Sequence, residues 1–142
     1  MDDQTLTYAL RLLSRRDYSR HELGRRLDGK FGADAGAVME WLERRGYLDD
    51  RRYARNFVSS HPAWARRRVD AALEERGIAS EARAEALDGG SWFSTTEALK
   101  DRMDRMRLEA PLSRKDAARL ARFLARMGYD PAEIGEELER RL

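Results

Sequence analysis

The segment that decides the fold is LERRGYLDDRRYARN, residues 42–56. One amphipathic run ends at Leu42, the chain turns at Gly46 and Tyr47, and a second run opens behind two aspartates. Glycine after the last turn of a helix can take the left-handed conformation that residues with a β-carbon resist. The aromatic residue that follows can then fold back on the helix that has just ended. The segment therefore predicts two helices joined by a tight glycine-aromatic turn.

The same pattern recurs at three other places in the chain. Each copy has an apolar helix end, a glycine (an aspartate in the first copy), then an aromatic residue or isoleucine, and a new helix. The other copies are LSRRDYSRHELGRRL (13–27), LEERGIASEARAEAL (73–87) and LARMGYDPAEIGEEL (124–138). Four copies of one turn in 142 residues predict an array of helical repeats with several small cores.

Helix starts are marked by short polar side chains with a carboxylate three residues on, which together satisfy unpaired backbone amides. These pairs are Ser19 with Glu22, Ser94 with Glu97, Asp130-Pro131 with Glu133 and, in a weaker form, Ser113 with Asp116. Apolar residues run at helical spacing between the starts. The predicted helices are 4–16, 19–28, 34–45, 50–60, 64–76, 80–88, 94–108, 113–128 and 131–141.

We therefore predict an all-α fold of three tandem three-helix repeats, each resembling a helix-turn-helix, in an elongated and curved array. The predicted repeats are residues 1–48, 49–90 and 91–142. The best candidate linkers are Gly89-Gly90-Ser91 and Glu109-Ala110-Pro111, because glycine and proline interrupt helices.

Composition excludes several classes of protein. The chain has no cysteine, so disulfide frameworks and thiolate chemistry are excluded. No uninterrupted apolar run of about 18 residues occurs, which predicts no transmembrane helix. The first residues are acidic and do not resemble a secretory signal sequence. These features together predict a cytoplasmic location.

Arginine dominates the basic residues of the chain. Of the 28 basic residues only Lys30, Lys100 and Lys115 are lysine, and 25 are arginine. Arginine offers planar, bidentate contacts to phosphate or carboxylate, although a GC-rich genome also produces an arginine excess. The net charges of the three predicted repeats are +1, 0 and +1. Affinity for nucleic acid would therefore have to come from local stripes of charge.

The best such stripe lies in the predicted helix 113–128 and comprises Lys115, Arg119, Arg122 and Arg126. Their spacing of four, three and four residues places them within an arc of roughly 60° on one side of a helix. Leu120 and Leu124 lie on the neighbouring face. The stripe is therefore a candidate contact for phosphates or for an acidic protein groove, and the alternative is an ordinary solvated face. A second candidate is the run Arg66, Arg67 and Arg68.

Conspicuous polar residues elsewhere have simpler explanations than chemistry. Asp49 and Asp50 could bind a divalent cation, but capping of the following helix explains them without further ligands. Three arginines that follow, Arg51, Arg52 and Arg55, are expected to be their partners within that helix. His21 and Glu22 lack the second histidine that a zinc-protease helix needs one turn on. We therefore predict no catalytic residue, no metal site and no cofactor.

Four stretches of the chain resemble the RecX family. These are YALRLLSRRDYSRHELGRRL (8–27), LERRGYLDDRRYARNFV (42–58), RRVDAALEERGI (67–78) and RLARFLARMGYDPAEIGEEL (119–138). The most specific part is the motif Gly46, Tyr47, Leu48, Asp49 and Asp50. Ala65 and Ala72 depart from the residues usual in that family, and residues 91–112 show little likeness beyond helical periodicity.

The resemblance implies a non-enzymatic regulator of a RecA-type recombinase. It implies a monomer that lies in the groove of the recombinase filament on DNA, most often as an inhibitor, in recombination, DNA repair and the SOS response. Direct contact with single- or double-stranded DNA is a further expectation.

Two other classes of protein remain as alternatives. One is a small DNA-binding protein that uses a helix-turn-helix pair, although the helices after the glycine turns carry as much acid as base. The other is a scaffold solenoid, which would need apolar or acidic concave grooves.

Overall fold

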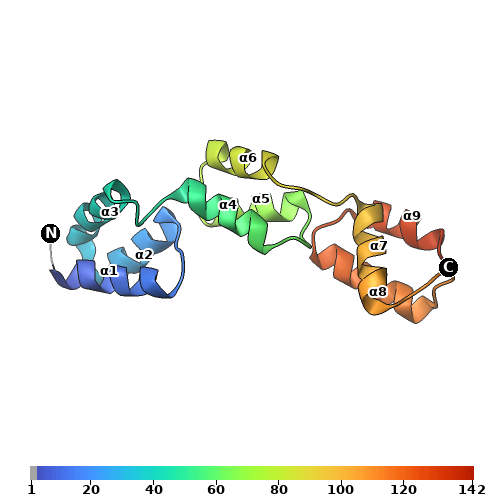
Figure 1. The fold of residues 1–142 in the computed structure, drawn as a ribbon. Helices are drawn as coiled ribbons and strands as arrows, with labels where there is room; N and C mark the ends of the chain where they lie inside the picture. The colour runs from blue at the N-terminus through green and yellow to red at the C-terminus, as the bar shows by residue number, and fades with distance from the viewer. Residues whose placement is uncertain (1–2) are drawn as a thin grey trace. The chain divides into compact units, whose positions relative to one another are not determined.

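All regular structure in residues 3–142, which the computed structural model describes, is helical (Figure 1). The helices within this range are α1 (Asp3–Arg15), α2 (Arg20–Phe31), η1 (Gly32–Asp34, a 3-10 helix), α3 (Ala35–Arg44), α4 (Asp50–Ser60), α5 (Arg66–Glu75), α6 (Ser80–Asp88), α7 (Thr95–Met106), α8 (Arg114–Arg126) and α9 (Pro131–Glu139). The prediction of an all-helical chain is confirmed.

The helix bounds agree closely with the sequence pattern. Helices α4 and α6 begin and end where they were predicted, at 50–60 and 80–88. The largest difference is the end of α2, which continues to Phe31 and leads directly into η1. The ring of Phe31 packs against that of Tyr8 in α1, with 5.4 Å between centroids. This contact offsets the low helix propensity of the glycine at position 29.

The described chain divides into two compact units. Unit 1 comprises the described residues up to Ser60 together with Asp70–Gly90. In it, α1, α2 and α3 enclose a core with fully buried leucines and a valine, and α4 packs against α6. Unit 2 comprises His61–Val69 and Ser91–Leu142. Its helices α7, α8 and α9 pack on one another around fully buried leucines at positions 99, 120 and 124.

The glycine turns take the conformation that the repeat predicts. Gly46, Gly77 and Gly128 have φ values of +78°, +78° and +97°. In each turn the next residue donates its N–H to the carbonyl five residues earlier, at 2.9 to 3.1 Å. The first copy differs, because Asp17 is not among the described residues with positive φ, and its carboxylate accepts the N–H of Tyr18 at 3.1 Å.

The residue after the turn is buried in three copies and exposed in one. Tyr18, Ile78 and Tyr129 are buried, whereas Tyr47 is 47% exposed. Leu48 takes the interior position beside it and is buried. Tyr47 still folds back on the preceding helix, because its ring stacks on Trp41 at 6.0 Å with an interplanar angle of 6°.

Helix starts follow the predicted capping, except that two of the four carboxylates bind other partners. The capping boxes that begin with Ser19 and Ser94 are confirmed. The side chains of Ser113 and Asp130 accept the expected backbone N–H groups, each at 3.1 Å. The carboxylates of Asp116 and Glu133 do not complete capping boxes, so that part of the prediction is wrong. Asp116 pairs with Arg119 at 3.5 Å. Glu133 accepts the hydroxyl hydrogen of Thr95 at 2.5 Å, and this bond ties α9 to the start of α7.

Candidate binding surface

Helix α8 carries the four basic residues of the predicted stripe on a face that stays exposed. These residues, called the basic ridge below, are Lys115, Arg119, Arg122 and Arg126. On the other side of the helix, Leu120 and Leu124 are completely buried in the core of unit 2. The apolar face fixes the rotation of α8 in its unit, and the ridge is therefore held toward solvent.

The basic ridge has little neutralising charge around it. Arg119 forms an ion pair with Asp116 at 3.5 Å, within the same helix. Lys115, Arg122 and Arg126 form no ion pair within residues 3–142. Exposed like charges on one face repel each other by modest amounts. A polyanionic partner would relieve this repulsion.

In the second candidate run, Arg66 to Arg68, two arginines bind backbone carbonyls, a structural role that the sequence pattern did not predict. Arg67 donates from Nε to the carbonyl of Gly128 at 2.5 Å and from Nη2 to that of Tyr129 at 3.3 Å. Arg68 donates from Nη1 to the carbonyl of Arg126. The carbonyl of Arg126 is the last of α8, where a helix leaves its final acceptors without backbone partners, and those of Gly128 and Tyr129 belong to the turn after it. Within unit 2, Arg67 and Arg68 therefore supply hydrogen-bond donors at the C-terminal end of α8.

Two aromatic rings, those of Trp64 and His61, lie close to Arg68 within unit 2. The guanidinium carbon of Arg68 lies 3.7 Å from the ring centre of Trp64, a cation–π contact. The ring of His61 lies 4.2 Å from that of Trp64. Trp64 therefore holds Arg68 in place, a role that its position near a helix start did not reveal.

The motif from Gly46 to Asp50 builds the junction between α3 and α4. Asp49 caps α4, because its Oδ1 accepts the N–H groups of Arg51 and Arg52 at 3.0 and 3.1 Å. Asp50 reaches a different helix, and its Oδ1 accepts the N–H of Arg20 at the start of α2, at 2.8 Å. Burial raises the pKa of Asp50 above its ordinary value. Both aspartates thus serve the fold of unit 1.

We predicted that Arg51, Arg52 and Arg55 pair with the two aspartates inside α4. The structure shows that this prediction is wrong. Arg51 forms an ion pair with Glu85 of α6 at 3.1 Å. Arg52 donates to the carbonyls of Gly46 and Tyr47, at 2.9 and 3.4 Å. The side chain of Asp49 is already occupied by backbone amides, so these guanidinium groups bind other acceptors.

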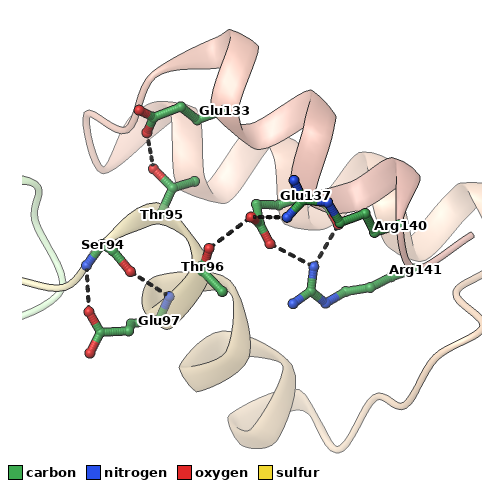
Figure 2. Close-up of polar contacts among 8 residues, drawn as sticks. All are labelled: Ser94, Thr95, Thr96, Glu97, Glu133, Glu137, Arg140 and Arg141. Atoms are coloured by element: carbon green, nitrogen blue, oxygen red, sulfur yellow. Dashed lines mark hydrogen bonds and ion pairs between the residues drawn. The ribbon is translucent and has the colours of Figure 1, made fainter.

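A polar cluster joins α9 to the start of α7 in unit 2, and Figure 2 shows its contacts. Thr96 donates its hydroxyl hydrogen to Glu137 at 2.8 Å, next to the Thr95–Glu133 bond. Glu137 also forms ion pairs with Arg140 and Arg141, each at 2.8 Å. These partners, Thr96 first among them, hold the pKa of Glu137 below its ordinary value. These polar and charged groups bind one another, so the cluster stabilises the fold of unit 2.

No group of three or more histidine, cysteine, aspartate or glutamate side chains within residues 3–142 is arranged to hold a metal ion. In the same range, no helix combines the length and the apolar character that a membrane crossing requires.

Comparison with known proteins gives matches along the chain. The family described as "RecX, first three-helix domain" matches residues 6–42, and "RecX, second three-helix domain" matches residues 49–87. The protein named Regulatory protein RecX from Thermus thermophilus is 39% identical over 131 residues, which cover 91% of this chain and 86% of that protein. Its namesake from Halorhodospira halophila is 34% identical over 133 residues, covering 89% and 81%.

A solved structure agrees with this relationship at the level of the fold. The crystal structure of RecX from Lactobacillus salivarius aligns with a TM-score of 0.66 and 17% identity, over 96% of each chain. The two matched three-helix domains include α1 to α6 almost entirely, and the relatives extend the match into the last helices. On the strength of these matches, the chain belongs to the RecX family of regulatory proteins.

Proposed function

We propose that this protein binds the filament of a RecA-type recombinase on DNA and lowers its activity in recombination and repair. Membership of the RecX family carries the proposal, because relatives along nearly the whole chain are regulatory proteins. The action is binding without turnover, so it needs no cofactor, and one copy of the chain is sufficient.

The basic ridge of α8 carries the contact in this proposal. Its four side chains are exposed, and only Asp116 neutralises part of their charge within residues 3–142. A recombinase filament on DNA presents phosphates and acidic protein surface, and arginine binds both groups through its planar fork. Arg66, Arg67 and Arg68 form a secondary contact in this proposal.

We also propose that the predicted repeats of the chain contact successive subunits of the filament. The three predicted repeats, residues 1–48, 49–90 and 91–142, would each contribute a surface toward a partner built from repeating subunits. Linked weak contacts add to a strong one when the geometry permits simultaneous binding.

Co-sedimentation with recombinase filaments tests the proposal. The protein is mixed with a RecA-type recombinase, with and without single-stranded DNA, at two salt concentrations. We expect the parent protein to sediment with the filament, and an Arg119→Ala, Arg122→Ala, Arg126→Ala variant to sediment much less. The parent's affinity should fall faster with salt than that of the variant, because it releases more counterions.

A matched control removes three exposed arginines whose charges are already paired. Arg44, Arg51 and Arg105 form ion pairs with Glu40, Glu85 and Asp101 and lie at least 61% exposed. Their triple alanine variant has the same net charge as the ridge variant and should bind like the parent. Equal binding by parent and ridge variant would remove the ridge from the contact. No binding by the parent would refute the proposed function itself.

A further inference from the structure

A hollow of about 530 Å³ lies beside the basic ridge, between α7 and α8 in unit 2. Arg119, Arg122 and Arg126 line it from α8, and Arg102 lines it from α7. Met106 and Phe123 form its apolar part. Four guanidinium groups from two helices therefore surround one space, and the basic ridge of α8 contains only three of them.

The charge around this hollow is unbalanced. None of its lining residues is acidic. A hollow of similar size in unit 1, about 540 Å³, has Arg16, Arg25, Arg26 and Arg76 in its wall but also Glu22 and Glu75. There Arg16 and Glu22 form an ion pair at 3.6 Å. Two carboxylates thus offset half of the positive charge around the unit 1 hollow, whereas the unit 2 hollow requires all of its negative charge from outside.

Arg102 is the most unusual member of the set. Its guanidinium carbon lies 4.0 Å from the ring centre of Phe123. Its Nε is buried and has no hydrogen-bond partner within residues 3–142. An unpaired buried donor is costly, because it has lost water without gaining an acceptor. The packing against Phe123 holds this charged group at the hollow despite that cost.

We propose that Arg102, Arg119, Arg122 and Arg126 form a binding site for the sugar-phosphate backbone of a DNA strand. The proposal rests on the function proposed above and deepens it, because it names the DNA of the filament, in place of the recombinase surface, as the partner of the ridge. Arg102 is the new member of the contact, and Phe123 is the support that positions it.

The spacing of the arginines favours a DNA strand over an acidic protein surface. From Arg119 to Arg126 the rise along the helix axis is roughly 10 Å. A strand of duplex DNA supplies a phosphate about every 3.4 Å of axis, so this span meets about three of them. Because every nucleotide carries a phosphate, each guanidinium finds a partner in any register. A protein surface offers this only if its carboxylates happen to match.

Binding of a fluorescent oligothymidylate to the full chain, without recombinase, tests the proposal by anisotropy. We expect Arg102→Met to bind about tenfold more weakly or worse, because a charged hydrogen bond is worth roughly that factor. The slope of log affinity against log salt should also become shallower by about 0.7 for a lost phosphate contact. Methionine keeps an unbranched apolar stem over Phe123, and a thermal melt checks that folding survives.

The matched control is Arg105→Met on the same helix. Arg105 pairs with Asp101 at 3.0 Å and is 70% exposed, so its loss should leave oligonucleotide binding unchanged. If Arg102→Met unfolds, Arg122→Gln replaces it, because Arg122 is exposed. Unchanged binding and salt slope in the folded variant overturn the site. Equally strong competition by oligoglutamate overturns phosphate as its ligand. A parent that binds filaments but no oligonucleotide overturns the DNA contact and leaves the proposed function standing.

Discussion

Replacing Gly77 by alanine is expected to destabilise the protein considerably more than replacing Gly46. The two glycines occupy equivalent positions in successive copies of the repeat, and both have a φ of +78°. They differ in surroundings: a β-carbon at Gly46 would meet nothing within 4 Å, whereas one at Gly77 would stand 2.3 Å from the β-carbon of His21. The pair therefore separates backbone strain from steric crowding.

The magnitude of each effect can be estimated from these contacts. The left-handed conformation costs an L-residue roughly 1–2 kcal/mol, and this cost applies to both substitutions. At Gly77 the new methyl group would also stand 2.6 Å from Cγ of His21. A change of rotamer cannot move the β-carbon of His21, so the backbone of α2 or of the turn must shift. Overpacking of this kind costs roughly 1–3 kcal/mol. We expect a loss of about 1–2 kcal/mol for Gly46→Ala and about 3 kcal/mol or more for Gly77→Ala.

Urea unfolding followed by circular dichroism measures both changes. His21→Gly supplies the control, because it removes the atom that crowds Gly77, at its own cost of about 1 kcal/mol in a helix. The double variant should therefore lose less free energy of unfolding than the sum of the two single variants. Equal losses for Gly46→Ala and Gly77→Ala, or a purely additive double variant, would refute the crowding argument.

Two further predictions concern unit 2. Arg107 ends α7 in the left-handed region with φ +55°. Arg107→Gly should therefore raise the free energy of unfolding, measured with urea, by about 0.5–1 kcal/mol, after allowing for the greater freedom of glycine in the unfolded chain. Arg105→Gly, inside α7, should lower it, and a fall for both would contradict this explanation. The lowered pKa of Glu137 means that its contribution to stability is present above the ordinary value of 4.5 and is lost as pH falls through the lower folded value. Glu137→Gln should therefore be less stable than the parent at pH 7 and converge with it toward pH 3, and a constant gap across that range would count against the assignment.

Helices and turns could be predicted because their causes are local. A serine with a glutamate three residues on supplies both halves of a capping box, whatever the rest of the chain does. The positive φ of Gly46, Gly77 and Gly128 follows equally from one residue and its place after a helix. The end of α2 was missed because Phe31 is held by Tyr8 of another helix, and such a contact has no periodic signature.

The candidate site was predicted only in part for the same reason. The ridge lies on one helix, where spacing decides which residues share a face. Arg102 enters the site from α7, and Arg67 and Arg68 bind carbonyls about 60 positions further along the chain. Side-chain contacts between helices depend on packing angles, which helical periodicity does not encode.

The hydrogen bonds at the four turns give several of the arginines a structural role that needs no binding partner. Arg52 and Arg83 each lie six residues after their turn glycine, and they donate to the carbonyls of the equivalent residues Tyr47 and Ile78. At the fourth turn that position is Ile134, and Arg67 of α5 provides the bond to Tyr129 instead.

In the first turn the adjacent Arg16 donates to the carbonyl of Asp17 at 3.3 Å. An arginine therefore binds a carbonyl at every copy of the turn, through the rigid fork of donors that lysine lacks. Total charge is for this reason a poor guide to binding in this chain. The best candidates for binding a partner are arginines whose side chains do not bind a backbone carbonyl. Arg119, Arg122 and Arg126 meet this criterion, and their spacing also places them on one face of α8.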